Sequence, residues 1–357
     1  MKYWRGYLTA GILFACTWAL QTFAKGHIAL MDTIYPYITR MMQDFLANWS
    51  GGVDFCVWQV LLLALAAVAI GTLVLVLVFK WNPVQWFGWV CAVVALVSFL
   101  NTALFGLNQY AGSLAEDIRL EETDYTITEL EKAAAYYRDQ ANSVSDLLKR
   151  DKKGNVVLSD FDTLSQRAAN GFDRLVKEDS LAVFAGSMEP VKKLGWSGNY
   201  TKKGVTGVTV GLTGEAAVNP DVPSVLMPFA ICKEMVHRMS ILVPKDASFG
   251  AYMACMANPD PQFQYSGALM GYRYCLEALE ELGRDKIVRA KENANVRKDL
   301  DACNAFLKQG EEGDADTCDL LTSWHIQEVV LPALIEEEEP FDPLDKEQVD
   351  LSEHPDA

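Results

Sequence analysis

The sequence predicts three N-terminal transmembrane helices followed by a mostly helical α+β domain outside the membrane. Three observations carry this prediction. Residues 1–107 contain three long apolar runs without charge, and residues 108–335 show helical patterns interrupted by one short strand pattern. The third is Lys233–His237, which reads as a zinc-binding helix motif with one ligand replaced. A chain of 357 residues is long enough for such an anchor and one domain of ordinary size.

The three apolar runs form the predicted membrane anchor, residues 1–107. They cover about 7–24, 55–79 and 84–107, and each is near or above the ~20 residues that a helix needs to cross hydrocarbon. None carries an ionisable residue at its centre, which argues against an ion or proton pathway. The predicted partner of this part is the lipid bilayer.

Basic residues set the predicted orientation. Lys2 and Arg5 precede the first run, and Lys80 lies between the second and third. Because short loops rich in basic residues stay in the cytoplasm, we predict a cytoplasmic N-terminus, with residues 25–54 and everything after 107 outside. We expect the first run to be a retained anchor. The alternative is a signal peptide with a poor cleavage site at Ala24, which leaves the large domain on the same side.

Charge and cysteine content exclude two classes of function for the rest of the chain. Residues 108–357 carry 26 basic and 44 acidic residues, a net charge of −18, so the domain should repel nucleic acid. This part has five cysteines and no C-x-x-C pair, which excludes a Cys₄ zinc site. A Cys303–Cys318 disulfide is left open if the compartment is oxidising.

The soluble domain is predicted to extend over residues 108–335. Thr126 and Glu129 form a capping-box pattern ahead of the first helix, Val205–Leu212 reads as a strand or hairpin, and Pro228 opens the helix that carries the Lys233 motif. The acidic tail, 336–357, is predicted to be disordered. The other helices are predicted at 126–149, 159–177 (capped by Ser159), 246–258, 262–282, 284–308 and 316–335.

The motif Lys233-Glu234-Met235-Val236-His237 is H-E-x-x-H with its first histidine replaced by lysine. In the intact motif two imidazoles four residues apart bind Zn²⁺ from one helical face, and the glutamate acts as general base on the metal-bound water. Glu234 therefore occupies the base position and His237 the second ligand position. Lys233 stands where the first ligand belongs.

Four further segments carry a resemblance. They are LFGLNQY (104–110), GEAAVN (214–219), LMPFAI (226–231) and FQYSG (263–267). With the Lys233 motif they resemble a bacterial family of membrane-anchored proteins of uncharacterised function in the H-E-x-x-H (gluzincin-type) zinc-peptidase superfamily. The resemblance implies a zincin-like fold, a place in the bacterial cytoplasmic membrane and a third ligand position at Asp246. The departures are Arg238 and Ser240, both beside the metal site.

Glu215 and Tyr265 lie in two of these segments. Packing or local hydrogen bonding is the expected role for each. A place in the cleft, as substrate clamp or transition-state donor, is the alternative.

Lys233 argues against a bound metal. An ammonium ~4 Å from Zn²⁺ at an effective dielectric of about 20 is repelled by ~8 kcal/mol, and deprotonating it at neutral pH costs roughly 5 kcal/mol. Either figure removes much of the ~10–16 kcal/mol that a full zinc site supplies. We expect no cofactor, and we expect Lys233 to pair with Asp246 in place of the metal. Alternatively, Asp246 is only a helix N-cap.

The predicted function is a catalytically inactive, metallopeptidase-like protein that binds a peptide, an envelope component or a partner protein. One alternative is an active zinc metallohydrolase with Glu234 as base and His237, Asp246 and His325 as ligands. A second alternative is a structural subunit of a membrane complex, whose acidic domain docks partners.

Overall fold

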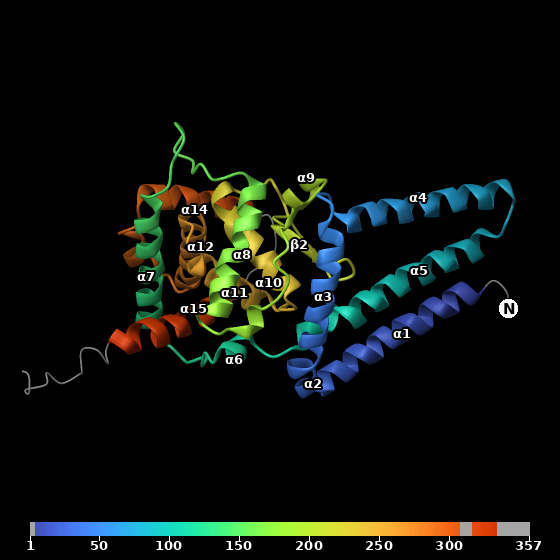
Figure 1. Cartoon of the computed structure of the whole chain (residues 1–357), viewed down its shortest axis with the longest axis horizontal. Coiled ribbons are helices and arrows are strands. Elements are labelled where there is room, and N and C mark those ends of the chain that lie inside the picture. The colour runs from blue at the N-terminus through green and yellow to red at the C-terminus, as the bar shows by residue number, and fades with distance from the viewer. Residues whose placement is uncertain (1–3, 308–315, 334–357) are drawn as a thin grey trace, which may run out of the picture.

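The computed structural model describes residues 4–307 and 316–333 (Figure 1). The tail predicted over 336–357 lies outside these residues. The helices are α1 (Arg5–Gly26), α2 (Ile28–Thr33), α3 (Tyr35–Gly51), α4 (Val57–Val78), α5 (Pro83–Leu104), α6 (Leu114–Ile118), α7 (Ile127–Ser145), α8 (Phe161–Lys177), α9 (Ser197–Thr201), α10 (Met227–Arg238), α11 (Pro244–Ala257), α12 (Pro261–Glu281), α13 (Asp285–Arg289), α14 (Ala294–Leu307) and α15 (Thr317–His325). The strands are β1 (Lys192–Lys193), β2 (Gly207–Val210) and β3 (Glu215–Val218).

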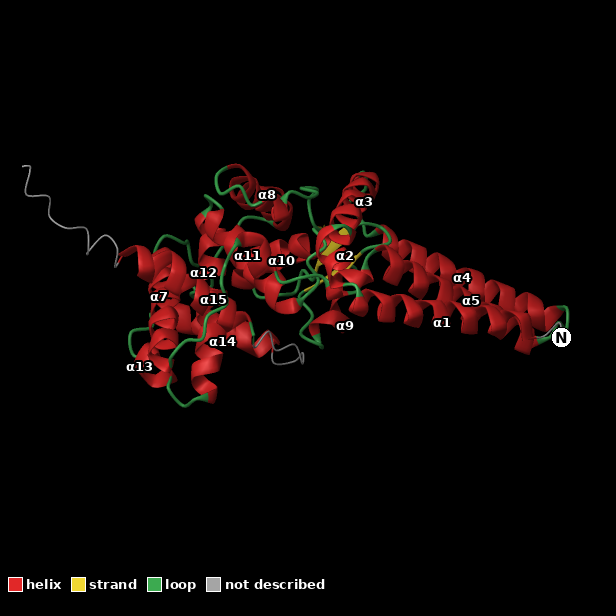
Figure 2. Ribbon diagram, turned by 90° about the horizontal axis from the view of Figure 1, so that it is seen from below, coloured by secondary structure: helices red, strands yellow, loops and turns green. Residues whose placement is uncertain are grey.

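Helices α1, α4 and α5 are each long and apolar enough to cross a membrane. They confirm the three predicted helical runs and project together from one side of a mostly helical domain (Figures 1 and 2). Asn82 begins α5, because its side chain accepts the backbone N–H of Val84 at 2.9 Å. The third run ends three residues earlier than predicted, at Leu104, and Gly106–Tyr110 forms a separate 3₁₀ turn.

Helices α1 and α5 pack closely through small residues. A Cβ atom on Gly6 would lie 2.4 Å from the carbonyl carbon of Gly88, so only glycine fits there. Ala10, Ala92 and Ala95 extend this buried contact along the two helices. Small residues let helix backbones approach where lipid supplies no hydrophobic driving force.

Two helices, α2 and α3, lie within residues 25–54. The sequence analysis predicted only that this segment lies outside the membrane and predicted no helix there. After α1 ends at Gly26, the chain forms α2 and then α3, which crosses between the apolar helices and the soluble domain (Figure 1). Neither helix has a side-chain N-cap. The usual start signal is therefore missing, and sequence reasoning did not predict them.

The soluble domain has a single large core. Helix α12 packs along α7 and against α10 and α11, and α11 also packs on α8 (Figure 2). The fully buried aromatic residues of this core include Tyr137, Phe172, Phe249, Tyr252 and Tyr272. All eight cysteines are free, so the Cys303–Cys318 bridge left open by the sequence is not formed.

The bounds of the first two helices predicted for this domain differ from the structure by a few residues. The Thr126–Glu129 capping box is confirmed at the start of α7, but that helix ends at Ser145 instead of about 149. Asp160, not Ser159, caps α8, because its carboxylate accepts the N–H of Thr163 at 3.0 Å.

The two last predicted helices differ from the structure. The single helix expected over 284–308 is divided into α13 and α14, because the Asn293 side chain accepts the N–H of Asn295 at 2.9 Å and starts a new helix. The helix expected over 316–335 consists of α15 followed by a π-helical turn, Ile326–Val330. Residues 308, 334 and 335 of these predictions lie outside the described residues.

The sheet has the order β1-β3-β2. Strand β3 is central and buried, pairs parallel with β1 and antiparallel with β2, and is covered by α10. The segment predicted to be a strand or hairpin, 205–212, contains the single strand β2, and the hairpin is completed by β3 outside that range, at 215–218. Strand β2 is therefore an edge strand.

The β2–β3 turn fits between the membrane-side helices. The carbonyl of Gly211 accepts a hydrogen bond from the Gln43 side chain of α3 at 2.9 Å. A Cβ atom on Gly211 would lie 2.2 Å from the Phe105 ring at the end of α5. Gly214 adopts φ +66°, and a Cβ atom on it would lie 2.5 Å from the backbone nitrogen of Ala47 in α3. Glycine is required at residue 211 because a neighbouring ring approaches closely. It is required at residue 214 because the backbone of α3 approaches closely and because the backbone there is left-handed.

A buried ion pair joins the same sheet to α4. Lys192 Nζ of β1 lies 2.7 Å from Glu215 Oε1 of β3. Glu215 also accepts the backbone N–H groups of Val57 and Trp58, at 2.7 and 2.9 Å. These are the first two residues of α4, so a carboxylate of the soluble domain caps an apolar helix. Lys192 further donates to the carbonyl of Ser50 at the end of α3, at 2.7 Å.

Candidate functional site

Helix α10 presents the Lys233 motif to a cavity of about 710 Å³. Lys233, Glu234 and His237 line it from one side, as the helical spacing predicted. The other walls come from residues 205–209, which include most of β2, and from the last turn of α5 with the 3₁₀ turn after it. The cavity therefore lies where the soluble domain meets the apolar helices.

Glu234 is buried against the edge strand. Its carboxylate accepts a hydrogen bond from Thr209 Oγ1 at 2.7 Å, and its backbone carbonyl accepts one from the same hydroxyl at 3.0 Å. A Cβ atom on Gly207 would lie 2.4 Å from Glu234 Cγ. The strand can pass this close to α10 because residue 207 has no side chain. The close approach therefore explains why a glycine interrupts the strand pattern.

The ring of His237 is oriented by a backbone contact. His237 Nδ1 lies 2.9 Å from the carbonyl oxygen of Ile241. Since a carbonyl only accepts, Nδ1 carries the proton in the neutral ring and Nε2 carries the lone pair. A hydrogen bond from one ring nitrogen to a carbonyl is how many proteins orient a ligating imidazole.

Asp246 lies elsewhere, in the first turn of α11. It accepts hydrogen bonds from the backbone N–H of Leu114 and from Ser113 Oγ (3.4 Å), at the start of α6. Burial raises its pKa, and Lys245 is the cation that opposes this shift. Asp246 thus contacts the start of α6 and lies near the positive charge of Lys245. These contacts replace the expected pair with Lys233. It is not the N-cap of α11 either, since that position is Val243.

His325 is packed among aromatic rings of the core. Its ring centroid lies 5.0 Å from that of Tyr136 on α7, and burial lowers its pKa, as does the nearby charge of Lys132. His237, Asp246 and His325, the predicted ligand set, therefore lie in three separate parts of the domain. Within residues 4–307 and 316–333, no three His, Cys, Asp or Glu side chains are grouped so that they could hold a metal ion.

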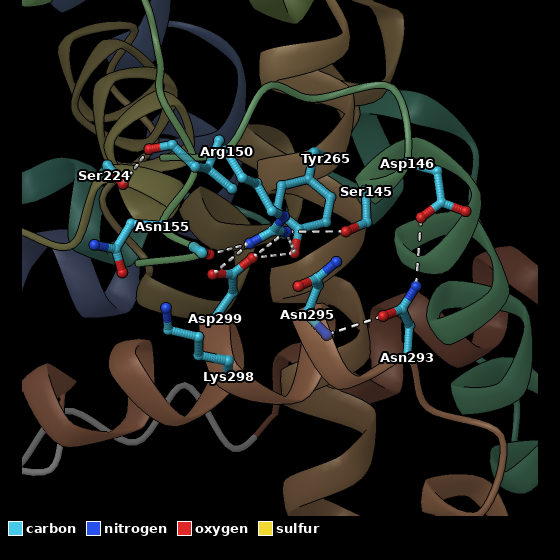
Figure 3. A network of polar contacts seen from close by, with 12 residues as sticks. Ser145, Asp146, Arg150, Asn155, Ser224, Tyr265, Asn293, Asn295, Lys298 and Asp299 are labelled. Carbon is cyan, nitrogen blue, oxygen red and sulfur yellow. Dashed lines mark hydrogen bonds and ion pairs between the residues drawn. The ribbon is translucent and has the colours of Figure 1, made fainter. Parts of the chain in front are cut away.

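Glu215 and Tyr265 lie away from the cavity. Glu215 belongs to the ion pair that caps α4. The Tyr265 hydroxyl donates to Asp299 Oδ2 at 2.6 Å, and the Arg150 guanidinium lies 2.6 Å from the same oxygen (Figure 3). Burial raises the pKa of Tyr265, as does the charge of Asp299. Both side chains make buried hydrogen bonds, a role that the sequence favoured over a place in the cleft, but their partners lie far away along the chain.

The sequence did not single out the strand side of the cavity. Gly207 and Thr209 lie in the glycine-containing segment that was predicted as a strand or hairpin, but neither residue was named as a site residue. Arg238, beside His237, was noted only as a departure from the resembling family. It is buried, donates to the carbonyl of Ser187 at 2.9 Å, and burial lowers its pKa to about 10.

Comparison with known proteins identifies one relationship. The model of the family described as "Protein of unknown function (DUF3810)" matches residues 31–320. No curated protein and no solved structure matches the chain. Because the match covers most of the chain, from α2 through the cavity to α15, the protein belongs to the DUF3810 family.

Proposed function

We propose that this protein is a membrane-anchored, extracytoplasmic domain of gluzincin-type ancestry that binds an extended peptide without metal chemistry. The observation that carries the proposal is the edge strand β2, which lies beside Glu234 and lines the same cavity as Lys233 and His237. An edge strand beside an H-E-x-x-H helix is suited to hold a peptide by strand addition.

The register of the sheet identifies the backbone groups that would bind the peptide. Asn219 donates to the carbonyl of Thr206 at 2.8 Å, so residue 206 faces β3. The carbonyl of Val218 accepts from Leu194 on the β1 side, at 2.9 Å, so its partner Gly207 faces away from β3. Backbone directions alternate along an antiparallel strand. Gly207 and Thr209 therefore direct their N–H and C=O groups to the outer edge.

Substitution of Thr209 tests strand addition. We expect Thr209→Pro to abolish binding of an extended peptide, because proline removes an N–H that faces the outer edge and not β3. Thr209→Val is the matched control: it also loses the hydroxyl that contacts Glu234 but keeps the N–H. The measurement is binding of the purified full chain in detergent to an array of random extended decapeptides. Equal signals from the proline and valine variants would contradict strand addition.

Lys233 is the reason to exclude metal chemistry from the proposal. Its ammonium stands at the first-ligand position of the motif, and the residues predicted to complete a ligand set, Asp246 and His325, do not line the cavity. A cation at this position opposes binding of Zn²⁺ by several kcal/mol.

Zinc content tests this part of the proposal. We expect the purified full chain to contain far less than one zinc per chain. Lys233→His should raise the content several-fold, because it restores two imidazoles on one face of α10. Adding His237→Ala should cancel the gain, and Lys245→His, outside the motif, should leave the content unchanged. The measurement is elemental analysis after dialysis against micromolar zinc. Stoichiometric zinc in the unmodified chain would support the metallohydrolase alternative instead.

A further inference from the structure

Helix α3 exposes a continuous face of large apolar side chains. These residues recur every three or four positions, so they lie on one side of the helix, and Phe45 at its centre is 71% exposed. Within residues 34–49 this face carries no charged residue. Its members are Ile34, Tyr37, Ile38, Met41, Phe45 and Trp49.

The opposite face of α3, which packs on the soluble domain, is made of small and polar residues. Thr39, Gln43, Ala47 and Ser50 are buried there. Thr39 donates to Ser240 Oγ at 3.0 Å, and Gln43 donates to the carbonyl of Gly211. This is the reverse of an ordinary surface helix, which turns its apolar face to the core and its polar face to water.

The position of α3 identifies what covers the exposed face. The helix follows α1, which ends at Gly26, and precedes α4, which begins at Val57, so it lies at the level where the apolar helices meet the domain. Figure 1 shows it running along this boundary, with the domain on one side and α1, α4 and α5 projecting on the other. The exposed apolar surface continues through Phe55 into α4.

We propose that α3 lies in the surface of the bilayer, with its apolar face in contact with the lipid acyl chains. The inference rests on the proposal that α1, α4 and α5 cross the membrane, and it adds a second contact parallel to the surface. A helix of this kind sinks about 5–10 Å into the boundary between headgroups and acyl chains. Trp49 and Tyr37 suit this depth, because their rings are apolar with a polar edge.

One consequence concerns the cavity. Helix α3 binds the β2–β3 turn through Gln43, and α5 supplies a cavity wall through Thr102 and Phe105. With α3 in the surface, the cavity opens next to the headgroups. The polypeptide that it binds is then one that already lies at the membrane, such as the segment of another membrane protein just outside the bilayer.

Depth-dependent quenching tests the position of α3. An environment-sensitive fluorescent amino acid is incorporated by stop-codon suppression at residue 45 of the full chain, which is reconstituted in phosphatidylcholine vesicles. Leu147, 70% exposed on the soluble domain, is the matched control for exposure, and Val68, 62% exposed within α4, is the control for the bilayer interior. Quenchers are iodide in the buffer and lipids with a nitroxide near the glycerol or near the chain end.

We expect the probe at residue 45 to be quenched several-fold more by the nitroxide near the glycerol than the probe at residue 147. The probe at residue 68 should respond most to the nitroxide near the chain end. Strong iodide quenching at 45, equal to that at 147, would place the face in water and overturn the proposal. Protection from both iodide and lipid would overturn it too, since a second copy or another protein would then cover α3. A probe at Met41, one turn away, repeats the measurement if the variant at 45 does not fold.

Discussion

Glu215→Gln is expected to lower the free energy of unfolding by about 3–5 kcal/mol, the range observed when one partner of a buried ion pair is removed. The substitution leaves the ammonium of Lys192 buried without its carboxylate; the two side chains are 9% and 0% exposed. It also replaces a charged acceptor of the two N–H groups at the start of α4 with an amide. The measurement is thermal or denaturant unfolding of the full chain in detergent.

The adjacent lysine gives a matched control. Lys193 is 49% exposed and pairs with the exposed Asp162 at 3.0 Å, so Lys193→Met should change stability by less than about 0.5 kcal/mol. Lys192→Met combined with Glu215→Gln should cost less than the sum of the two single changes, because no buried charge is left without its partner. Additive losses, or equal effects at 192 and 193, would show that the ion pair does not hold the sheet to α4.

Asp299→Ala is expected to have the second large effect, also about 3–5 kcal/mol. Asp299 is buried, and it accepts from both the Arg150 guanidinium and the Tyr265 hydroxyl, each at 2.6 Å (Figure 3). Removing it leaves a mostly buried guanidinium and a buried hydroxyl without their acceptor. Tyr265→Phe removes only one hydrogen bond to a charged group, so it should cost less, about 1.5–3 kcal/mol.

Asp301, two residues along the same helix, provides the control for Asp299. It is exposed, and Asp301→Ala should stay within about 0.5 kcal/mol of the unmodified protein. Unfolding curves of the three variants in the same detergent give the comparison. If Tyr265→Phe were as damaging as Asp299→Ala, the hydrogen bond from the Tyr265 hydroxyl alone, and not the ion pair with Arg150, would account for the contribution of Asp299.

The parts of the fold that local sequence determines were predictable. Uncharged runs of 18 to 25 residues predicted α1, α4 and α5, and the capping box of Thr126 and Glu129 predicted the start of α7. The spacing of Lys233 and His237 placed them on one face of α10, because residues four apart adjoin on any helix. These signals depend only on neighbours along the chain.

The contacts that sequence reasoning missed join distant parts of the chain. Lys192 and Glu215 are 23 residues apart, and Glu215 caps a helix that begins 158 residues earlier. Nothing local to GEAAVN reveals that partner, so its glutamate could be assigned a hydrogen-bonding role but no specific partner. Asp246 and His325 were assigned to a metal site for the same reason: their residue types suit zinc, but their positions depend on how α11 and α15 pack. Helix α3 was missed because no side-chain N-cap marks its start.

The cap on α4 has a consequence for the order of events during synthesis. The ribosome makes residue 57 long before residue 215, so the first turn of α4 waits for a carboxylate that has not yet been translated. Until β3 pairs with β1, the beginning of this apolar helix holds N–H groups without their final acceptor. Completion of the membrane part therefore follows folding of the soluble part, and a chain that stalls before residue 215 presents an unfinished helix end.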